Sequence, residues 1–479
     1  MTDSRDKNAR FPEGSSAALL EAPARFVTAA ALYDGHDAAI NLVRRGLVQA
    51  GAEVIHLGHT RPADEIVKAA IEEDAAAVAV SSYQGGHMEF FLYLRELLDR
   101  DGARHMAIFG GGGGVILPSE IEILEKAGIT KVFSPDDGLK LGISGMMQTM
   151  VDGARRAARA SLEEPGERTG RAALARAITL VELGAAPPLP AEDPGTTRAI
   201  VLGVTGTGGA GKSSLVDELV LRLTRDFPDL RIGILAVDPS KRKTGGALLG
   251  DRLRMNAIYR PEVFLRSFAT RQSGAEIAPA AEGAIQVLSA AGYGLVVVET
   301  TGIGQGSSAI YDLADLSLYV MTADFGGATQ LEKIDMLDFA DLVALNKADR
   351  RGAEDAVRMV AKQVGRGGRK PPPFVGATTA SRYNDPGVQA LHGALVERLS
   401  MRDARFRKDV KDAQAAPPVV IVPSARERYL SEAVEAVRRY KERTAREVEA
   451  MRTFESIQTA ARALAEDRPA APAGAMDAL

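Results

Sequence analysis

The stretch Gly206-Thr207-Gly208-Gly209-Ala210-Gly211-Lys212-Ser213 decides the reading of the second half of this 479-residue chain. It matches the pattern GxxxxGK[ST] and lies between an apolar run at residues 199–205 and a helix-like segment at 214–224. Glycines let backbone N–H groups turn inward around phosphates, and the following helix adds its positive N-terminal end. A chance glycine-rich loop rarely has this context, so we predict a nucleotide-binding P-loop.

Within this loop, each residue type has an expected task. Lys212 is expected to pair with the β- and γ-phosphates and to act in catalysis, while Ser213 is expected to ligate Mg²⁺. The backbone of the preceding residues would hold the phosphates: Gly208, Gly209, Ala210 and Gly211.

A second motif, Asn346-Lys347-Ala348-Asp349, indicates which base is bound. It follows an apolar run and has the NKxD form of guanine-specific P-loop proteins. The carboxylate of Asp349 can accept hydrogen bonds from guanine N1–H and the 2-amino group, whereas adenine lacks both donors and would leave it unpaired. We therefore expect GTP rather than ATP, with Asn346, Lys347 and Asp349 at the base.

Acidic residues lie where a magnesium ion is expected. Asp238 and Glu299 each end an apolar run, Asp251 follows a glycine-rich stretch, and Thr300 comes next after Glu299. Because Mg²⁺ is a hard cation that prefers oxygen ligands, we expect these four residues to bind it together with Ser213. The alternative for each carboxylate is a solvated strand end.

Two further residues concern the phosphates and the attacking water. Arg254 is expected to reach a phosphate; the alternative is an exposed helix residue. Small regulatory GTPases have glutamine directly after the glycine of DxxG, but Ile303 follows Gly302 here and Gln305 comes later. We place Gln305 with Lys212 and Glu299 as candidate catalytic residues, and expect slow hydrolysis that accelerates on rearrangement or partner contact.

The first half of the chain alternates apolar runs with amphipathic segments. This alternation predicts a parallel sheet covered on both faces, in a flavodoxin-like doubly wound domain. The expected strands are 26–33, 53–57, 76–82, 105–109 and 131–133, and the expected helices are 37–50, 63–74, 88–100 and 119–127. A second series has expected strands at 199–205, 232–237, 263–268, 295–299, 316–322, 342–346 and 373–376.

Asp34-Gly35-His36 follows the first of these strands, so His36 lies at the edge where such sheets bind ligands. Asp34 could hold one ring nitrogen and leave the other free for a metal. Alone, a structural histidine would be the better interpretation. However, Ser81 and the glycine run ending in Gly113-Gly114 follow two later strands, and small residues there would leave a deep slot.

These residues resemble the DxHxxG, SxL and GG motifs of the cobalamin-binding domains of adenosylcobalamin-dependent mutases. The resemblance implies that His36 ligates cobalt, that Asp34 orients it, and that Ser81, Gly113 and Gly114 line the slot for the displaced nucleotide tail. Two positions depart from the motifs. Ala39 stands in place of the last glycine of DxHxxG and Tyr83 in place of the leucine of SxL, and both would narrow the slot.

The second half resembles the G-protein chaperones that load and protect such mutases. The matching stretches are 237–240, 244–246 with 250–251, and 299–305. The order of the two domains is similar to the N-terminal half of the fused isobutyryl-CoA mutases. The resemblance implies adenosylcobalamin, GTP or GDP and Mg²⁺ as ligands, and a (β/α)₈ acyl-CoA mutase subunit as partner. It also implies a cobalamin adenosyltransferase as a further partner and a homo-oligomer.

We expect a lead-in at 1–24, a cobalamin-binding domain at 25–160, a helical linker at 161–198, a P-loop GTPase domain at 199–412, and a C-terminal helical extension and disordered tail at 413–479. A substrate-binding barrel needs about 250 residues and does not fit. Isomerisation would therefore need a separate or missing partner. The alternative function is a non-catalytic carrier or sensor that passes on cobalamin under GTP control. A long helix at 425–451 could pack on a neighbour or simply lie at the surface.

Composition excludes several classes of protein. The net charge of −4 argues against a nucleic-acid surface, and the absence of cysteine excludes disulfides, thiolate metal sites and iron–sulfur clusters. No apolar run is long enough to span a membrane, and the charged start, Met1–Lys7, is not typical of a signal peptide. These features fit a cytoplasmic protein.

Overall fold

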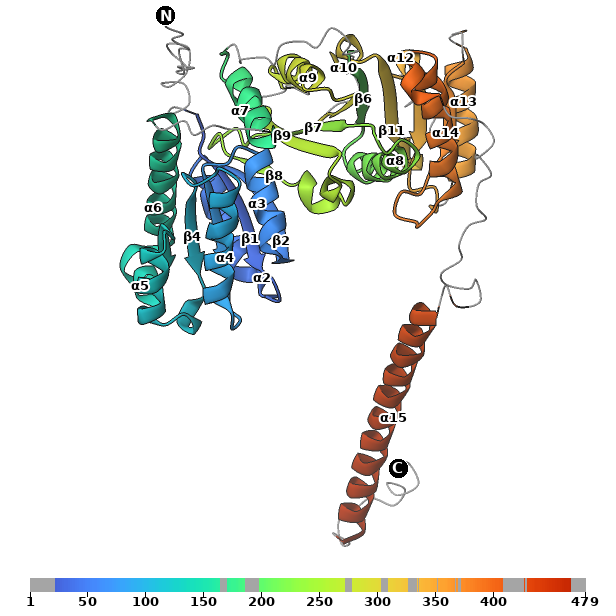
Figure 1. Ribbon diagram of the computed structural model, residues 1–479. Coiled ribbons are helices and arrows are strands. Elements are labelled where there is room, and N and C mark those ends of the chain that lie inside the picture. The colour runs from blue at the N-terminus through green and yellow to red at the C-terminus, as the bar shows by residue number, and fades with distance from the viewer. Residues whose placement is uncertain are drawn as a thin grey trace, which may run out of the picture. The chain divides into compact units, whose positions relative to one another are not determined.

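The computed structural model describes residues 22–163, 170–185, 198–271, 278–302, 309–325, 334, 336–350, 352–366, 368, 372–407, 426 and 429–466. The chain forms two compact units, Met1–Ala413 and Gln414–Leu479. The first unit holds two parallel sheets with helices on both faces (Figure 1). Gln305, the expected lead-in up to residue 21 and the tail from 467 lie outside the described residues.

The first sheet has the expected doubly wound topology. Its strand order is β5-β4-β3-β1-β2-β8, and all its pairings are parallel. Apart from β8, this is the flavodoxin-like order. The strands are β1 (Arg25–Ala31), β2 (Glu53–Arg61), β3 (Ala77–Ser81), β4 (Ala107–Gly111), β5 (Lys131–Phe133) and β8 (Ala247–Leu249).

Helices cover both faces of this sheet because each presents an apolar stripe to it. On one face, α2 (Asp37–Gln49) and α6 (Pro135–Glu163) pack through residues such as Leu47, Met147 and Val151. The other face carries α3 (Ala63–Glu72), α4 (His87–Arg100) and α5 (Pro118–Lys126). Helix α6 was not expected, because glycines interrupt its periodicity; Gly142 breaks the helical backbone with φ 63°.

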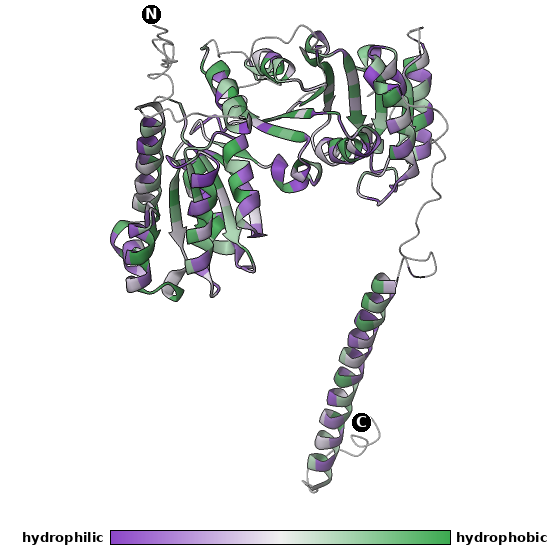
Figure 2. Ribbon diagram, in the orientation of Figure 1, coloured by the Kyte–Doolittle hydropathy of each residue, from purple (hydrophilic) through white to green (hydrophobic). Residues whose placement is uncertain are grey.

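The second sheet contains all seven expected strands, and its order is β13-β12-β11-β6-β10-β7-β9. The strands are β6 (Ile200–Gly206), β7 (Ile232–Asp238), β9 (Val263–Ala269), β10 (Leu295–Glu299), β11 (Leu316–Met321), β12 (Leu342–Leu345) and β13 (Phe374–Ala377). One face carries α8 (Lys212–Asp226) and α14 (Pro386–Ser400). The other carries α7 (Gly170–Glu182), α9 (Ala281–Ala290), α10 (Ala309–Leu313), α12 (Met336–Phe339) and α13 (Ala353–Gly365). Figure 2 shows both sheets as mainly hydrophobic.

Strand β8 departs from the expected organisation. It lies between β7 and β9 in sequence, yet it pairs with β2 of the first sheet, with Glu53 opposite Ala247 and Ile55 opposite Leu249. The sequence indicated only a glycine-rich stretch here, because three residues are too few to show a strand period. A segment of the nucleotide-binding half therefore completes the sheet of the other half.

The second unit contains one described long helix, α15 (Tyr429–Glu466), where a helix at 425–451 was expected. Its side chains are almost all exposed, and Figure 2 shows hydrophobic and hydrophilic residues mixed along it. None of the helices in the described part of the chain is both long and apolar enough to cross a membrane.

His56 on β2 makes stability depend on pH. Burial lowers the pKa of His56 from 6.5 to about 4, and the ring contacts Thr28 Oγ1 at 3.0 Å. Between pH 6.5 and about 4, His56 is protonated in the unfolded chain but stays neutral in the folded chain. The free energy of unfolding should therefore fall as the pH drops towards 4. The loss cannot exceed about 1.4 kcal/mol per pH unit, because the ring exchanges at most one proton.

The check is the urea midpoint of the full chain across this pH window, compared with His56→Gln. The variant should lose part of the acid sensitivity. Equal slopes for the two proteins would contradict the assignment.

Candidate functional site

The P-loop joins β6 to α8 and requires glycine for steric reasons. Gly206 has φ 145°, and a Cβ there would lie 1.9 Å from the carbonyl oxygen of Val320. Gly211 has φ 90°, and a Cβ there would lie 2.5 Å from Asn346 Nδ2. Substituting either residue would push the loop away from the neighbouring strands. The loop therefore holds its backbone N–H groups at the N-terminus of α8, where anions bind.

Lys212 lies in the concavity of this loop. Its Nζ donates to the carbonyl oxygens of Gly206 at 3.3 Å and Thr207 at 3.5 Å, and the side chain is buried. Gly302, with φ 71°, approaches so closely that a Cβ would lie 2.3 Å from Nζ. The ammonium group is thus placed between the P-loop and the segment after β10, where terminal phosphates of a bound nucleotide would lie.

The hydroxyl of Ser213 joins two of the expected carboxylates. Its Oγ lies 2.8 Å from Glu299 Oε1 and 3.1 Å from Asp251 Oδ1, and all three side chains are buried. Asp238 Oδ2 accepts the backbone N–H of Gly250 at 3.0 Å. The other oxygen of Glu299, Oε2, is buried and has no hydrogen-bond partner among the described residues.

Burial and mutual repulsion disfavour charge on these carboxylates. Burial, and next the charge of Asp251, raise the pKa of Asp238 to about 7 and that of Glu299 to about 8. Burial also raises the pKa of Asp251. A divalent cation would offset this cost. No three histidine or acidic side chains of the described residues form a metal site by themselves, and Mg²⁺ at a P-loop completes its shell with phosphate oxygens and water. The donor set fits that role.

Arg254 and Thr300 lie next to this cluster. Arg254 is exposed, and its charge partly opposes the rise that burial causes in the pKa values of Asp238 and Asp251, so its guanidinium is close to these carboxylates. The hydroxyl of Thr300 donates to Thr205 Oγ1 at 2.9 Å and its N–H to Val204 O at 3.0 Å. Thr300 therefore braces β10 against β6 in this structure.

The base-recognition motif follows β12 and lies beside the P-loop. Asn346 is buried, and its Nδ2 donates to Ala210 O at 2.8 Å. Lys347 has φ 57°, and its Nζ donates to Gly209 O at 2.7 Å. Asp349 is exposed and makes no hydrogen bond to another described residue. Its carboxylate is therefore available for guanine.

The segment after β13 supports this motif, and sequence reasoning missed it. Asn346 Oδ1 accepts hydrogen bonds from Thr378 Oγ1 at 3.2 Å and from the N–H of Ala380 at 3.0 Å. The N–H of Ala348 donates to Thr378 O at 3.0 Å. The available signal was the run of small residues, Thr378-Thr379-Ala380-Ser381, directly after an expected strand.

At the carboxyl edge of the first sheet, Asp34 orients His36. Asp34 Oδ1 lies 2.8 Å from His36 Nδ1 and accepts the N–H of His36 at 2.9 Å, while Oδ2 accepts the N–H of Tyr83 at 2.7 Å. Burial alone would raise the pKa of Asp34, but these hydrogen bonds hold it below its ordinary value. The carboxylate is fully buried, whereas the imidazole side chain is 64% exposed. Nε2 is thus free for a ligand from solvent.

A cavity of about 260 Å³ opens beside this histidine, between the ends of β3 and β4 and the helices α2 and α6. It is mainly apolar, and its lining includes Ala39, Ser81, Tyr83, Gly113 and Met146. The hydroxyl of Ser81 is buried without a hydrogen-bond partner among the described residues. An elongated ligand with polar groups would fill this cavity and satisfy that hydroxyl, so these residues fit the expected nucleotide tail.

Of the two glycines expected to line the slot, only Gly113 lines the cavity. Gly113 has φ 59° and lines the cavity, and a Cβ there would lie 3.0 Å from the ring of Tyr83. Gly114 has open space around its Cα and is not part of the cavity lining. Gly112, which the sequence did not single out, is more constrained, because a Cβ there would lie 1.9 Å from Ser82 O.

Comparison with known proteins agrees with this division of the chain. Residues 174–471 match the family model "Methylmalonyl Co-A mutase-associated GTPase MeaB", and residues 24–138 match the "B12 binding domain" model. The chain is 48% identical to a fused isobutyryl-CoA mutase of Geobacillus kaustophilus, over 92% of this chain and 43% of that protein. It is 50% identical to one of Nocardia farcinica, over 93% and 43% respectively. A putative GTPase of Pyrococcus abyssi is 42% identical over 38% of this chain and 57% of its own length.

The chain thus spans less than half the length of the fused mutases that it matches. Both family models agree with the two sheets: one match contains the P-loop and its carboxylates, and the other contains His36 and most of the cavity beside it. The chain belongs to the family of methylmalonyl-CoA mutase-associated GTPases and carries a B12-binding domain ahead of its GTPase domain.

Proposed function

We propose that this chain binds adenosylcobalamin in its first domain and hydrolyses Mg²⁺·GTP in its second. GTP binding and hydrolysis would gate the loading of the cofactor and the ejection of damaged cofactor. The observation that carries the proposal is the pair formed by buried Asp34 and exposed His36, in one compact unit with a complete P-loop. A GTPase alone has no use for a carboxylate-oriented imidazole above an apolar cavity.

In the nucleotide site, the protein supplies charge and position. Lys212 would bind the terminal phosphates, and Ser213 with Asp238, Asp251 and Glu299 would hold the magnesium ion. The bound cation would lower the pKa values of these carboxylates and so favour their charged form. In the cofactor site, Asp34 keeps a hydrogen bond on Nδ1, so Nε2 of His36 can ligate cobalt. Adenosylcobalamin supplies radical chemistry when it is bound.

The isomerase partner is part of the same proposal. The curated relatives are named fused isobutyryl-CoA mutases, and this chain spans 43% of the length of two of them. We propose that a (β/α)₈ acyl-CoA mutase segment or subunit provides the substrate site. The experiment is to combine the purified chain with such a partner and test acyl-CoA isomerisation with and without adenosylcobalamin.

Asp349 should determine base specificity. In Asp349→Asn, the amide oxygen can still accept N1–H, but the amide NH2 group faces the 2-amino donor of guanine, whereas it can donate to the 2-carbonyl of xanthine. GTP affinity should therefore fall by at least ~100-fold, and xanthosine triphosphate should bind better than GTP. Competition titrations with labelled nucleotide measure both, and Asp355→Asn, an exposed aspartate on α13, is the matched control. Unchanged GTP preference in Asp349→Asn would refute the assignment.

Glu299→Gln should separate stability from magnesium binding. Because the pKa of Glu299 is raised to about 8, folding at neutral pH requires proton uptake that glutamine does not need. The thermal midpoint of the ligand-free chain should rise, while Mg²⁺ affinity in the presence of GTP should fall by at least ~10-fold. Glu282→Gln, on the exposed side of α9, should change neither quantity. A variant that is destabilised but binds Mg²⁺ normally would contradict the role of Glu299.

His36→Ala should remove the axial ligand without unfolding the domain, because the side chain is largely exposed. The absorption spectrum of bound cobalamin should change to that of a form without histidine ligation. His59→Ala is the control, since His59 is an exposed histidine near the carboxyl end of β2. An unchanged spectrum in His36→Ala disproves the ligand assignment.

A further inference from the structure

The segment from Thr244 to Arg252 connects the two halves of the first unit. Thr244 Oγ1 donates to Val48 O at 3.1 Å, and the N–H of Ala247 donates to Ala52 O at 3.1 Å. Gly246 lies so close that a Cβ would be 2.2 Å from Val48 O. The start of this segment and β8 are therefore fixed to α2 and β2 of the cofactor domain.

The end of the same segment enters the nucleotide site. Asp251, two residues after β8, accepts the hydroxyl of Ser213. The preceding N–H, that of Gly250, donates to Asp238. Two carboxylates that we assign to magnesium therefore hold the carboxyl end of β8. A change in magnesium or phosphate contacts would act directly on this end.

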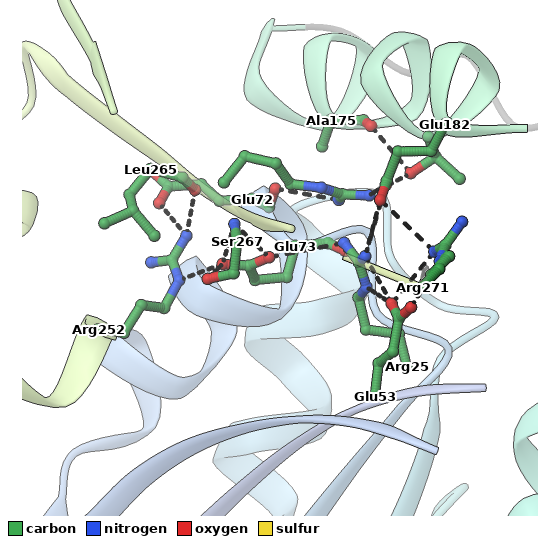
Figure 3. A network of polar contacts seen from close by, with 12 residues as sticks. Arg25, Glu53, Glu72, Glu73, Ala175, Glu182, Arg252, Leu265, Ser267 and Arg271 are labelled. Atoms are coloured by element: carbon green, nitrogen blue, oxygen red, sulfur yellow. Dashed lines mark hydrogen bonds and ion pairs between the residues drawn. The ribbon is translucent and has the colours of Figure 1, made fainter. Parts of the chain in front are cut away.

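Arg252 points the other way, towards the cofactor domain (Figure 3). It is only 2% exposed; its Nε donates to Glu73 Oε1 at 2.7 Å and its Nη2 to Glu72 Oε2 at 2.8 Å. Both glutamates lie at the end of α3 and are fully buried. Arg252 also donates to Leu265 O on β9. Asp251 thus contacts the expected magnesium site, and the next residue, Arg252, binds the cofactor domain.

Other contacts connect the pairs of Arg252 with Glu72 and Glu73 to the rest of the interface between the GTPase segment and the cofactor domain. Ser267 donates from its N–H and its hydroxyl to Glu73. Glu53, which faces Ala247 across the sheet, accepts Arg25 at 2.7 Å and Arg271 at 2.8 Å. Figure 3 shows these glutamates and arginines as one continuous network. A local shift of Arg252 would therefore disturb several buried ion pairs together.

Helix α2 extends the connection to the cofactor ligand. His36 is the residue immediately before α2, and Val48, which holds Thr244 and abuts Gly246, lies in its last turn. A packed helix transmits displacement along its axis better than a loop does. The nucleotide cluster, β8, α2 and His36 therefore form one uninterrupted chain of contacts.

We propose that Arg252 is a positioning residue that couples the nucleotide site to the cobalamin site through β8 and the paired glutamates Glu72 and Glu73. The inference rests on the proposed function, since it assumes that both ligands bind. Asp251 cannot follow a change at the γ-phosphate without moving Arg252 or opening a buried charge pair, and opening such a pair is strongly unfavourable. The two binding equilibria must therefore share this free energy.

The test is a coupling ratio measured on the full chain. Isothermal titration gives the Kd of a non-hydrolysable GTP analogue with Mg²⁺, with and without saturating adenosylcobalamin. The ratio of these constants should differ from one by ~5-fold or more in the wild type. In Arg252→Met, which keeps the volume but removes the charge, the ratio should approach one. Arg252→Lys should restore part of it.

Arg171→Met is the matched control. Arg171 on α7 pairs with the same Glu72 and donates to Val263 O, but it is not adjacent to a nucleotide-site residue. If weakening the interface were enough to change the coupling ratio, the ratio would change in both Arg171→Met and Arg252→Met. If Arg252 itself couples the sites, the ratio should approach one only in Arg252→Met. Thr244→Val, which removes the side-chain hydrogen bond to Val48 O, should bring the ratio closer to one and gives a milder variant if Arg252→Met does not fold.

Three outcomes overturn the inference. One is a folded Arg252→Met that keeps the wild-type ratio, and another is a ratio of one in a wild type that binds both ligands. The third is an equal loss in Arg171→Met. If the wild type binds only one of the two ligands, the proposed function itself fails, and this inference falls with it.

Discussion

Three buried carboxylates, Glu53, Glu72 and Glu73, are the constraint on which the first unit of this protein depends. All are inaccessible to solvent, and they belong to the cofactor domain. Arginines from the GTPase segment neutralise them, with Arg25 and the linker helix adding further pairs. Burying a charge is costly unless it is paired in good geometry, and losing one partner costs about 3–5 kcal/mol. The charges therefore specify how the two domains meet.

This interface connects the nucleotide site to the cofactor domain. Each site follows a general rule for parallel sheets, because both lie at the carboxyl ends of strands. Asp34 and His36 follow β1, and the P-loop follows β6. The two sheets are joined by β8, which belongs to the GTPase segment and completes the other sheet. It places a candidate magnesium ligand, Asp251, next in sequence to Arg252, which holds the cofactor domain. Binding at one site can thereby change the free energy of the other.

The sequence predicted local features well. Continuous apolar runs identified both parallel sheets, and motifs directly after them located the P-loop, Asp349 and the Asp34–His36 pair. These signals are local, because a strand followed by a special loop is contained in about ten residues. The structure brings Ser213, Asp251 and Glu299 into contact, and their roles remain predictions.

Long-range features could not be read in this way. Strand β8 has three residues, and its partner β2 lies almost two hundred residues earlier in the chain. In the sequence Arg252 resembles any charged residue beside Asp251, because its partners Glu72 and Glu73 lie 180 and 179 residues earlier. Helix α6 was hidden by its glycines. In each case the deciding interaction is tertiary and leaves no periodic pattern.

The central claim is that nucleotide state controls how this chain holds cobalamin. The most direct measurement is the rate at which adenosylcobalamin leaves the full chain, followed by stopped-flow absorbance. It would be taken with Mg²⁺ and either GDP or a non-hydrolysable GTP analogue bound. The account predicts rates that differ by ~5-fold or more between the two nucleotides, the lower end of typical coupling between sites. Equal release rates, with both nucleotides shown to be bound, would contradict it.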